Sequence, residues 1–199
     1  MRIASYNVEW FTALFDEDDR LVADAAPSFR HGVTRAAQVA ALGAVFRALD
    51  ADAVMVIEAP DQGRTRSTLR ALEGFAKAAG LRARAAALGF ANDTRQEIAL
   101  LYDPDALRVV HEPQGAATGP EGATGAPRFD GVLRLDLDID ATEDLVVFSK
   151  PPLELAVETR GGFAFRMIGA HLKSKAPHGA VTPEQAMTLA IANRRKQLA

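Results

Sequence analysis

The sequence has no cysteine, no long hydrophobic run and no excess of positive charge. Without cysteine, the chain can form no disulfide, thiolate nucleophile or cysteine-ligated zinc site. The formal net charge of −3 excludes a globally basic surface, so any nucleic acid would have to be held by a local cation cluster or a metal. No segment could span a membrane, and the first residues lack the apolar stretch of a signal peptide. We therefore expect a cytoplasmic protein with no membrane partner.

The sequence does contain enough apolar residues for a packed core. Hydrophobic residues make up 48% and charged residues 25% of its 199 residues, which is typical of one globular domain. Apolar runs predict strands at residues 2–8 and 53–57. Helical spacing of apolar residues predicts helices from about Thr34 to Asp50 and over residues 67–79, the second ending at Gly80. This alternation of strand and helix indicates an α/β fold.

The rest of the chain is dominated by strand patterns. Seven segments have this character: residues 81–88, 97–102, 107–112, 132–139, 145–148, 153–158 and 163–171. A Gly-, Ala- and Pro-rich loop covers residues 113–127, and Thr182 begins a helix that is still running at Ala199. We expect two packed sheets with helices outside, in a single domain over residues 1–199 that is truncated at its C-terminus.

Three strand-like runs each deliver one polar side chain near their C-terminal end. These side chains are the amide of Asn7, the carboxylate of Glu58 and the imidazole of His171. A polar residue that closes an apolar strand lies at the rim of a sheet. Together these groups could orient a substrate, bind a metal ion and move protons.

Two acidic residues are candidate metal ligands. Glu58 follows a buried run and needs a cation or a hydrogen-bond donor, and a carboxylate oxygen suits magnesium. Glu9 is expected to share a strand face with Asn7, because side chains two residues apart point the same way. An ion pair for Glu58 and a turn for Asn7 are the alternative interpretations.

Histidine and lysine supply the remaining candidates. His171 could donate a proton near neutral pH, or simply bond to the backbone. We expect His31, His111 and His178 to be surface residues. Lys150, in a proline-fixed turn before a strand, is a candidate phosphate contact or a solvated loop residue.

Five segments, in this order, resemble the endonuclease/exonuclease/phosphatase superfamily, whose fold is that of deoxyribonuclease I. They are RIASYNVEW at residues 2–10, DAVMVIE at 52–58, IALLYDP at 98–104, KPPL at 150–153 and GAHLKS at 169–174. The resemblance covers nearly the whole chain. It implies a four-layered α/β sandwich of the deoxyribonuclease I type, with the second sheet and C-terminal part incomplete here.

The resemblance also implies metal-dependent hydrolysis of phosphate esters. In such a site Asn7 orients the phosphate, Glu58 holds Mg²⁺ or Mn²⁺, and His171 stabilises the scissile phosphate or protonates the leaving oxygen. Glu9 corresponds to a second metal-side acid in some members, and Lys150 to a phosphate contact. In deoxyribonuclease-like members a glutamate on a middle strand supports the histidine, and here that position corresponds to either Gln96 or Glu97, which we expect on opposite faces.

The sequence departs from the family pattern in two places. Ile57 stands where the family usually has a glutamine before its metal-binding glutamate. The later Asp-x-Asn and Asp-His elements are absent, because residues 172–199 contain no aspartate and only His178. We therefore expect impaired activity. The alternatives are a non-catalytic remnant, or a phosphate-ligand-binding protein that uses Lys150, Lys173 and Lys175 without metal. The substrate, with nucleic acid among the candidates, is not readable from the sequence.

Overall fold

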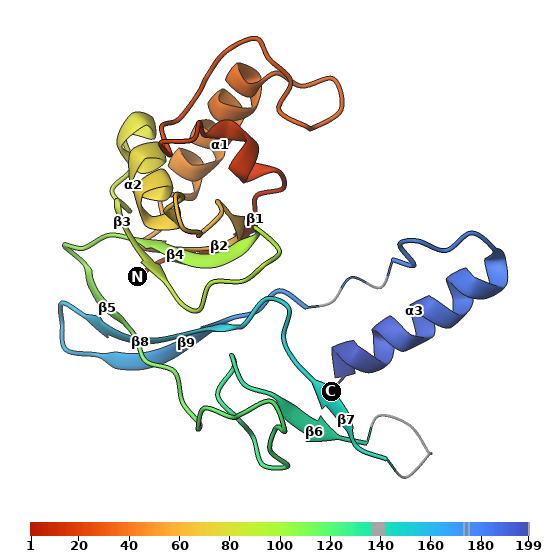
Figure 1. The fold of residues 1–199 in the computed structure, drawn as a ribbon. Coiled ribbons are helices and arrows are strands. Elements are labelled where there is room, and N and C mark those ends of the chain that lie inside the picture. Colours follow the sequence, from red (N-terminus) through yellow and green to blue (C-terminus); the bar gives the residue numbers. More distant parts are fainter. Residues whose placement is uncertain (137–141, 173, 175, 199) are drawn as a thin grey trace. The chain divides into compact units, whose positions relative to one another are not determined.

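The computed structural model describes residues 1–136, 142–172, 174 and 176–198. The described residues form a mixed α/β structure with three α-helices, one 3-10 helix and nine strands (Figure 1). They divide into two compact units, one of residues 1–114 and 149–170 and one of residues 115–148 and 171–199. That the two fold as the single expected domain stays a prediction.

A four-stranded sheet forms the centre of the first unit. Its strand order is β1-β2-β4-β3, with β1 at Ile3–Asn7, β2 at Ala53–Ala59, β3 at Ala85–Leu88 and β4 at Glu97–Tyr102. β1 and β2 are parallel, whereas β4 is antiparallel to both of its neighbours. The C-terminal ends of β1 and β2 and the start of β4 therefore meet at one end of the sheet.

Two capped helices cover one face of this sheet. α1, Arg35–Leu49, begins where the Thr34 side chain accepts a hydrogen bond from the Ala37 N–H. α2, Thr68–Ala79, is capped in the same way by Ser67 and ends at Gly80 in the left-handed conformation. Both helices were predicted, but the 3-10 helix η1, Phe11–Leu14, was not.

Apolar side chains of the helices, η1 and the sheet form the first core. Phe75 lies at its centre, with its ring 5.2 Å from the rings of both Phe11 and Phe46 in edge-to-face geometry. Such aromatic pairs stabilise a core beyond the area that they bury. The almost fully apolar run of β2 is explained by this packing, because its other face is buried as well.

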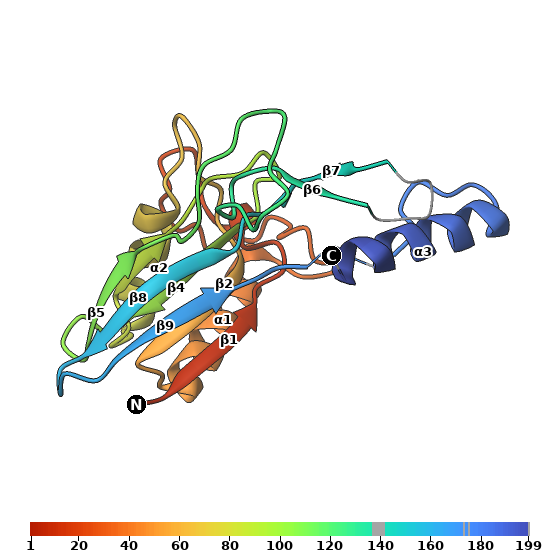
Figure 2. The ribbon, with the colours of Figure 1, turned by 90° about the horizontal axis from the view of Figure 1, so that it is seen from below.

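A second sheet packs on that other face. It has the order β5-β8-β9, with β5 at Leu107–His111, β8 at Leu153–Thr159 and β9 at Ala164–Gly169 (Figure 2). Leu100 of the first sheet and Leu155 of the second belong to the core between them. A Cβ at Gly169 would lie 3.0 Å from Ile98 and closer still to Met55, so glycine permits the close approach of β9. The first unit is thus a helix–sheet–sheet stack.

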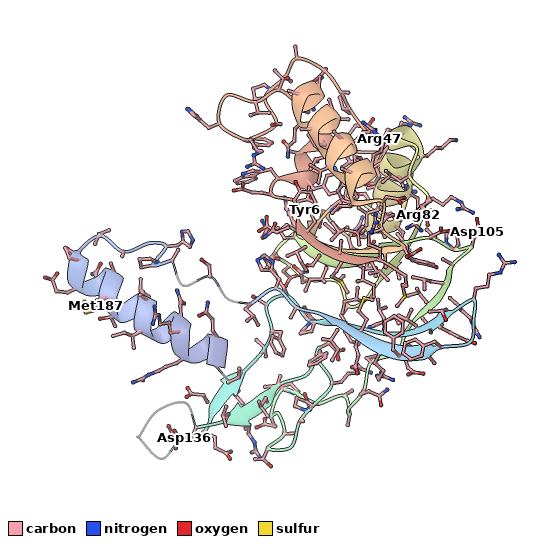
Figure 3. The ribbon with its side chains drawn as sticks, turned by 180° about the vertical axis from the view of Figure 1, so that it is seen from behind. Tyr6, Arg47, Arg82, Asp105, Asp136 and Met187 are labelled. Atoms are coloured by element: carbon pink, nitrogen blue, oxygen red, sulfur yellow. The ribbon has the colours of Figure 1, made fainter. Side chains whose placement is uncertain are left out.

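The second unit contains a short hairpin and one helix. β6, Leu133–Leu135, pairs with β7, Asp144–Val146, and α3 covers Pro183–Leu198. The strand predicted over residues 132–139 is therefore observed as β6, and its part from residue 137 onward lies outside the described residues. Met187 on α3 is exposed (Figure 3). None of the described helices is long and apolar enough to cross a membrane.

Paired charges gather at the end of the first sheet where β1 and β2 begin. Arg82 contacts Asp50 at 2.8 Å, Asp52 at 2.5 Å and Asp103 at 3.3 Å. Figure 3 shows Tyr6, near the end of β1, and Arg82 toward opposite ends of this sheet. The hydrogen bond from Arg82 lowers the pKa of Asp52, with help from the backbone N–H of Arg2. We call these residues, with Arg2, Arg84 and Asp105, the ion-pair end.

Candidate functional site

The parallel pairing of β1 and β2 brings Asn7 and Glu58 together. Asn7 is registered with Ile57, so Glu58 lies one residue beyond it at the same end of the sheet. The Asn7 amide donates a hydrogen bond from Nδ2 to Oε1 of Glu58 over 3.3 Å. Two of the three predicted strand-end residues are therefore in contact within the first unit.

Glu58 occupies an irregular position in its strand. The register between β2 and β4 shifts between Ile57 and Ala59, and the intervening Glu58 has a φ of +59°. A β-bulge of this kind redirects one side chain and interrupts the ladder. A non-glycine residue in the left-handed region costs about 1–3 kcal/mol and is characteristic of functional sites. The strand thus turns the Glu58 carboxylate out of the regular alternation.

Gln96 connects Glu58 to a lysine. It donates a hydrogen bond from Nε2 to Oε2 of Glu58 over 3.0 Å, and its Oε1 accepts one from Nζ of Lys150 over 2.5 Å. Gln96 thus contacts Glu58, whereas the expected support of His171 by Gln96 or Glu97 stays a prediction. We call the four linked residues, Asn7, Glu58, Gln96 and Lys150, the amide cluster.

Glu97 points away from the amide cluster and is fully buried. Its Oε2 accepts a hydrogen bond from Nδ2 of Asn92 over 2.7 Å, and its Oε1 accepts a long one, 3.4 Å, from the backbone N–H of Gln62. Burial raises the pKa of Glu97 to about 7, against the lowering by these hydrogen bonds. The side chain therefore holds the loops beside the site and titrates near neutral pH.

Glu9 differs from the sequence expectation. The strand expected to include Val8 ends at Asn7, and Glu9 lies in a turn before η1, so the argument that Asn7 and Glu9 share a strand face is wrong. The Glu9 carboxylate pairs with Arg30 over 3.3 Å, and its backbone carbonyl accepts a hydrogen bond from the buried Gln38. Its assignment as a metal ligand stays a prediction.

The histidines differ in their outcome. His171 follows β9 and belongs to the second unit, and its catalytic role stays a prediction. Lys173 and Lys175 lie outside the described residues. The expectation that His111 is a surface residue is wrong, because it is half-buried and its ring packs edge-to-face on Phe90 at 4.9 Å. His111 therefore contributes to packing.

The donor set of the amide cluster limits the metal it could hold. Among the described residues, no group of three or more His, Asp or Glu side chains could hold a metal ion. A carboxylate has about four acceptor positions, so Glu58 can accept from Asn7 and Gln96 and still offer an oxygen to a cation. Magnesium in phosphate sites keeps several waters and uses one or two carboxylates. The cluster thus fits a hydrated divalent ion better than a closed protein cage.

Thr12, which no sequence pattern singled out, holds the surrounding loops. The Thr12 hydroxyl on η1 accepts a hydrogen bond from the backbone N–H of Asp61 over 3.2 Å and donates one to the Arg95 carbonyl over 3.4 Å. Thr12 thereby ties the segments after β2 and before β4 to η1. Its sequence context carries no signal, because the contacts depend on backbone atoms far away in the chain.

No protein-family model, curated protein or solved structure matches this chain.

Proposed function

We propose that this chain binds phosphate esters at the amide cluster and belongs to a class of metal-dependent phosphoric ester hydrolases. The observation that carries the proposal is the link from Asn7 through Glu58 and Gln96 to Lys150. It combines one carboxylate for a cation, amides that donate hydrogen bonds, and one ammonium group for an anion. A phosphate with a bound divalent ion requires this combination of charges.

Each residue of the cluster has a separate role in the proposal. Glu58 would hold Mg²⁺ or Mn²⁺, which when bound would neutralise charge that develops on a phosphoryl oxygen. Asn7 orients the Glu58 carboxylate or the phosphate, and Lys150 contacts a phosphate oxygen. Gln96 fixes both neighbours, because it donates to Glu58 and accepts from Lys150. His171 of the second unit is proposed to stabilise the phosphate or protonate the leaving oxygen.

We further propose membership of the endonuclease/exonuclease/phosphatase superfamily and its four-layered sandwich. The supporting observation is the helix–sheet–sheet stack of the first unit, which would supply three of the four layers. The five sequence segments that resemble the superfamily, and their order along the chain, also support this proposal. The substrate class remains open within this proposal.

The second candidate function is phosphate binding without catalysis. It is favoured by the ammonium group of Lys150, which Gln96 holds by a hydrogen bond and which could bind an anion without a metal. In this case Lys150 would contact the anion while Glu58 serves only to position Gln96. The two candidate functions differ in turnover but not in phosphate binding, so binding and turnover have to be measured separately.

The substitution Glu58→Gln tests the proposed function. It keeps the shape of the side chain but removes the charge that would attract a divalent ion. We expect hydrolysis of bis(p-nitrophenyl) phosphate in Mg²⁺ or Mn²⁺ to fall by at least about a hundredfold. Calorimetry with Mn²⁺ should show a matching loss of metal binding, whether or not turnover is detectable.

Glu158→Gln is the matched control, because Glu158 is an exposed glutamate at the far end of β8. It should leave Mn²⁺ binding unchanged. Metal binding that is equal in both variants would contradict the metal role of Glu58. Phosphate binding that needs no metal and survives Glu58→Ala would support the non-catalytic candidate instead.

A further inference from the structure

Two large aromatic side chains stand exposed beside the amide cluster. Trp10 is 47% exposed and Phe29 is 72% exposed, and their ring centroids lie 6.2 Å apart at an interplanar angle of 39°. The two rings are therefore neighbours, but they do not bury each other. Each keeps a large part of its π surface in contact with solvent, which is unfavourable unless something else covers it.

The backbone under both rings is held in an unusual conformation. Trp10 has a φ of +64° and Phe29 a φ of +63°, and bulky residues rarely adopt this region. The loop at Phe29 is closed by hydrogen bonds on both sides, from the Ser28 N–H to the Val33 carbonyl and from the Val33 N–H to the Arg30 carbonyl. The rings are thus held outward by a fixed local structure.

The pair lies close to the proposed phosphate site. Trp10 follows Asn7 by three residues, so their Cα atoms are at most about 10 Å apart. The Phe29 loop is attached to the same region, because Arg30 pairs with Glu9 over 3.3 Å. About 10 Å corresponds to roughly three nucleotide steps along one strand. A base at or near a phosphate on the amide cluster could therefore reach the rings.

We propose that Trp10 and Phe29 form a stacking platform for a nucleobase, and that the phosphate ester bound beside them is a nucleotide or single-stranded nucleic acid. The proposal rests on the proposed function, since it names the substrate class of the same site. Aromatic side chains stack on bases of any sequence, because every base has a π face. Phosphate binding with an aromatic surface alongside is the arrangement that a single strand requires.

The surroundings of the rings favour a nucleobase over a protein partner. The ring pair is bordered in sequence by charged Glu9 and Arg30 and by His31. Because aromatic residues and arginine are enriched in protein–protein interfaces too, the proposed phosphate site within reach of the rings is what selects the nucleobase. A stacking site for nucleic acid combines aromatic rings with cations that follow the phosphate backbone.

The fluorescence of Trp10 provides a direct test, because it is the only tryptophan in the chain. The full chain is titrated in EDTA with a short oligothymidylate and with an abasic oligonucleotide of equal length and charge. We expect the oligothymidylate to quench Trp10 and to bind on the order of tenfold more tightly than the abasic strand. Thymidine 5′-monophosphate in a parallel titration distinguishes a free nucleotide from a strand as the source of the base.

Two phenylalanine variants complete the test. Phe29→Ala should remove the tenfold preference for the base-bearing strand, whereas Phe163→Ala should keep it, because Phe163 is 64% exposed but lies in the β8–β9 turn. Equal affinity for abasic and base-bearing strands would overturn the proposal and leave the rings as a protein contact.

The outcome is separate from that of the proposed function, because the titration contains no metal and requires no turnover. Stacking without an effect of Glu58→Gln on metal binding would overturn the hydrolase alone. Loss of metal binding in Glu58→Gln, together with equal binding of both strands, would overturn the stacking platform alone.

Discussion

The two ends of the four-stranded sheet hold their polar groups in different ways. At the ion-pair end, full charges meet opposite charges: Arg82 alone contacts three carboxylates. At the other end, the amide cluster uses neutral amides between the carboxylate of Glu58 and the ammonium of Lys150. In the first arrangement opposite charges meet directly, whereas in the second Gln96 bridges a carboxylate and an ammonium group by hydrogen bonds.

The backbone differs between the ends as well. At the ion-pair end, the positive φ of Asp50 is explained by its position as the C-cap of α1. At the opposite end, Trp10, Glu58 and Arg95 all have positive φ, and no helix C-cap accounts for them. Strained residues persist only where the surrounding structure holds them. One end of the sheet is therefore held by ion pairs, and backbone strain gathers at the other end, where the proposed phosphate site lies.

Arg82→Met should produce the largest change in stability. It would leave Asp52 and Asp103, both mostly shielded from solvent, without their shared cation. Removing one partner of a buried network destabilises strongly, but Arg82 is 36% exposed and Arg84 still pairs with Asp103, so we expect the free energy of unfolding in urea to fall by about 2–3 kcal/mol. Arg108→Met is the control, because the Arg108 side chain is 80% exposed and, among the described residues, pairs only with Glu158 at 4.0 Å.

The same two variants test the division between the ends. If the ion-pair end serves stability alone, Arg82→Met should bind the oligothymidylate as the unsubstituted chain does, at temperatures where it remains folded. A large loss of affinity for the oligothymidylate in the folded variant would contradict this division, because it would show that the two ends are coupled.

The sequence predicted the regular elements of the first unit well, for local reasons. The caps Thr34 and Ser67 and the stop at Gly80 are local signals, and α1 and α2 lie where these signals placed them. The segment at residues 97–102 is observed as β4 with the same bounds, because an apolar run of this length suits a strand buried on both faces. The coarse α/β class followed from these elements.

The details of the site depended on non-local contacts that the sequence could not provide. The contact between Gln96 and Glu58 was not predicted, because it joins two strands at the bulge of Glu58. Glu9 was predicted on the same strand face as Asn7, but β1 ends one residue earlier than its apolar pattern suggested. The Glu9 carboxylate instead forms an ion pair with Arg30, which is distant in sequence. Register and ion pairing are tertiary properties, and single-residue patterns do not encode them.

Glu97, which lies at the same end of the sheet as the amide cluster, should have a smaller effect on stability. Its pKa of about 7 in the folded chain lies above the value of about 4.3 expected when unfolded. The folded state therefore binds more protons than the unfolded state between these values, and stability falls as the pH rises through this window. We expect the free energy of unfolding to decrease by about 2 kcal/mol from pH 5 to pH 8.

Urea denaturation at a series of pH values measures this slope. Glu97→Gln removes the titrating group, so its stability should be nearly independent of pH in the same window, whatever its absolute value. If the free energy of unfolding of Glu97→Gln still decreased with pH in this window, another titrating group would cause the pH dependence.

Gln96→Ala should have the smallest effect on stability and a selective one on the site. It removes the hydrogen bonds to Glu58 and Lys150 but leaves both charges in place. Residues that orient a metal ligand typically contribute about tenfold to metal affinity, and we expect Mn²⁺ binding to weaken by that factor. Gln114→Ala is the control, because Gln114 is an exposed glutamine whose side chain makes, within the described part of the chain, only a 3.4 Å hydrogen bond to the Glu112 carbonyl. If Gln96→Ala instead lowered stability as much as Arg82→Met and left Mn²⁺ binding intact, the amide cluster would be a structural feature like the ion-pair end. A weakened Mn²⁺ affinity with a nearly unchanged free energy of unfolding would mean that the two ends differ in function as well as in chemistry.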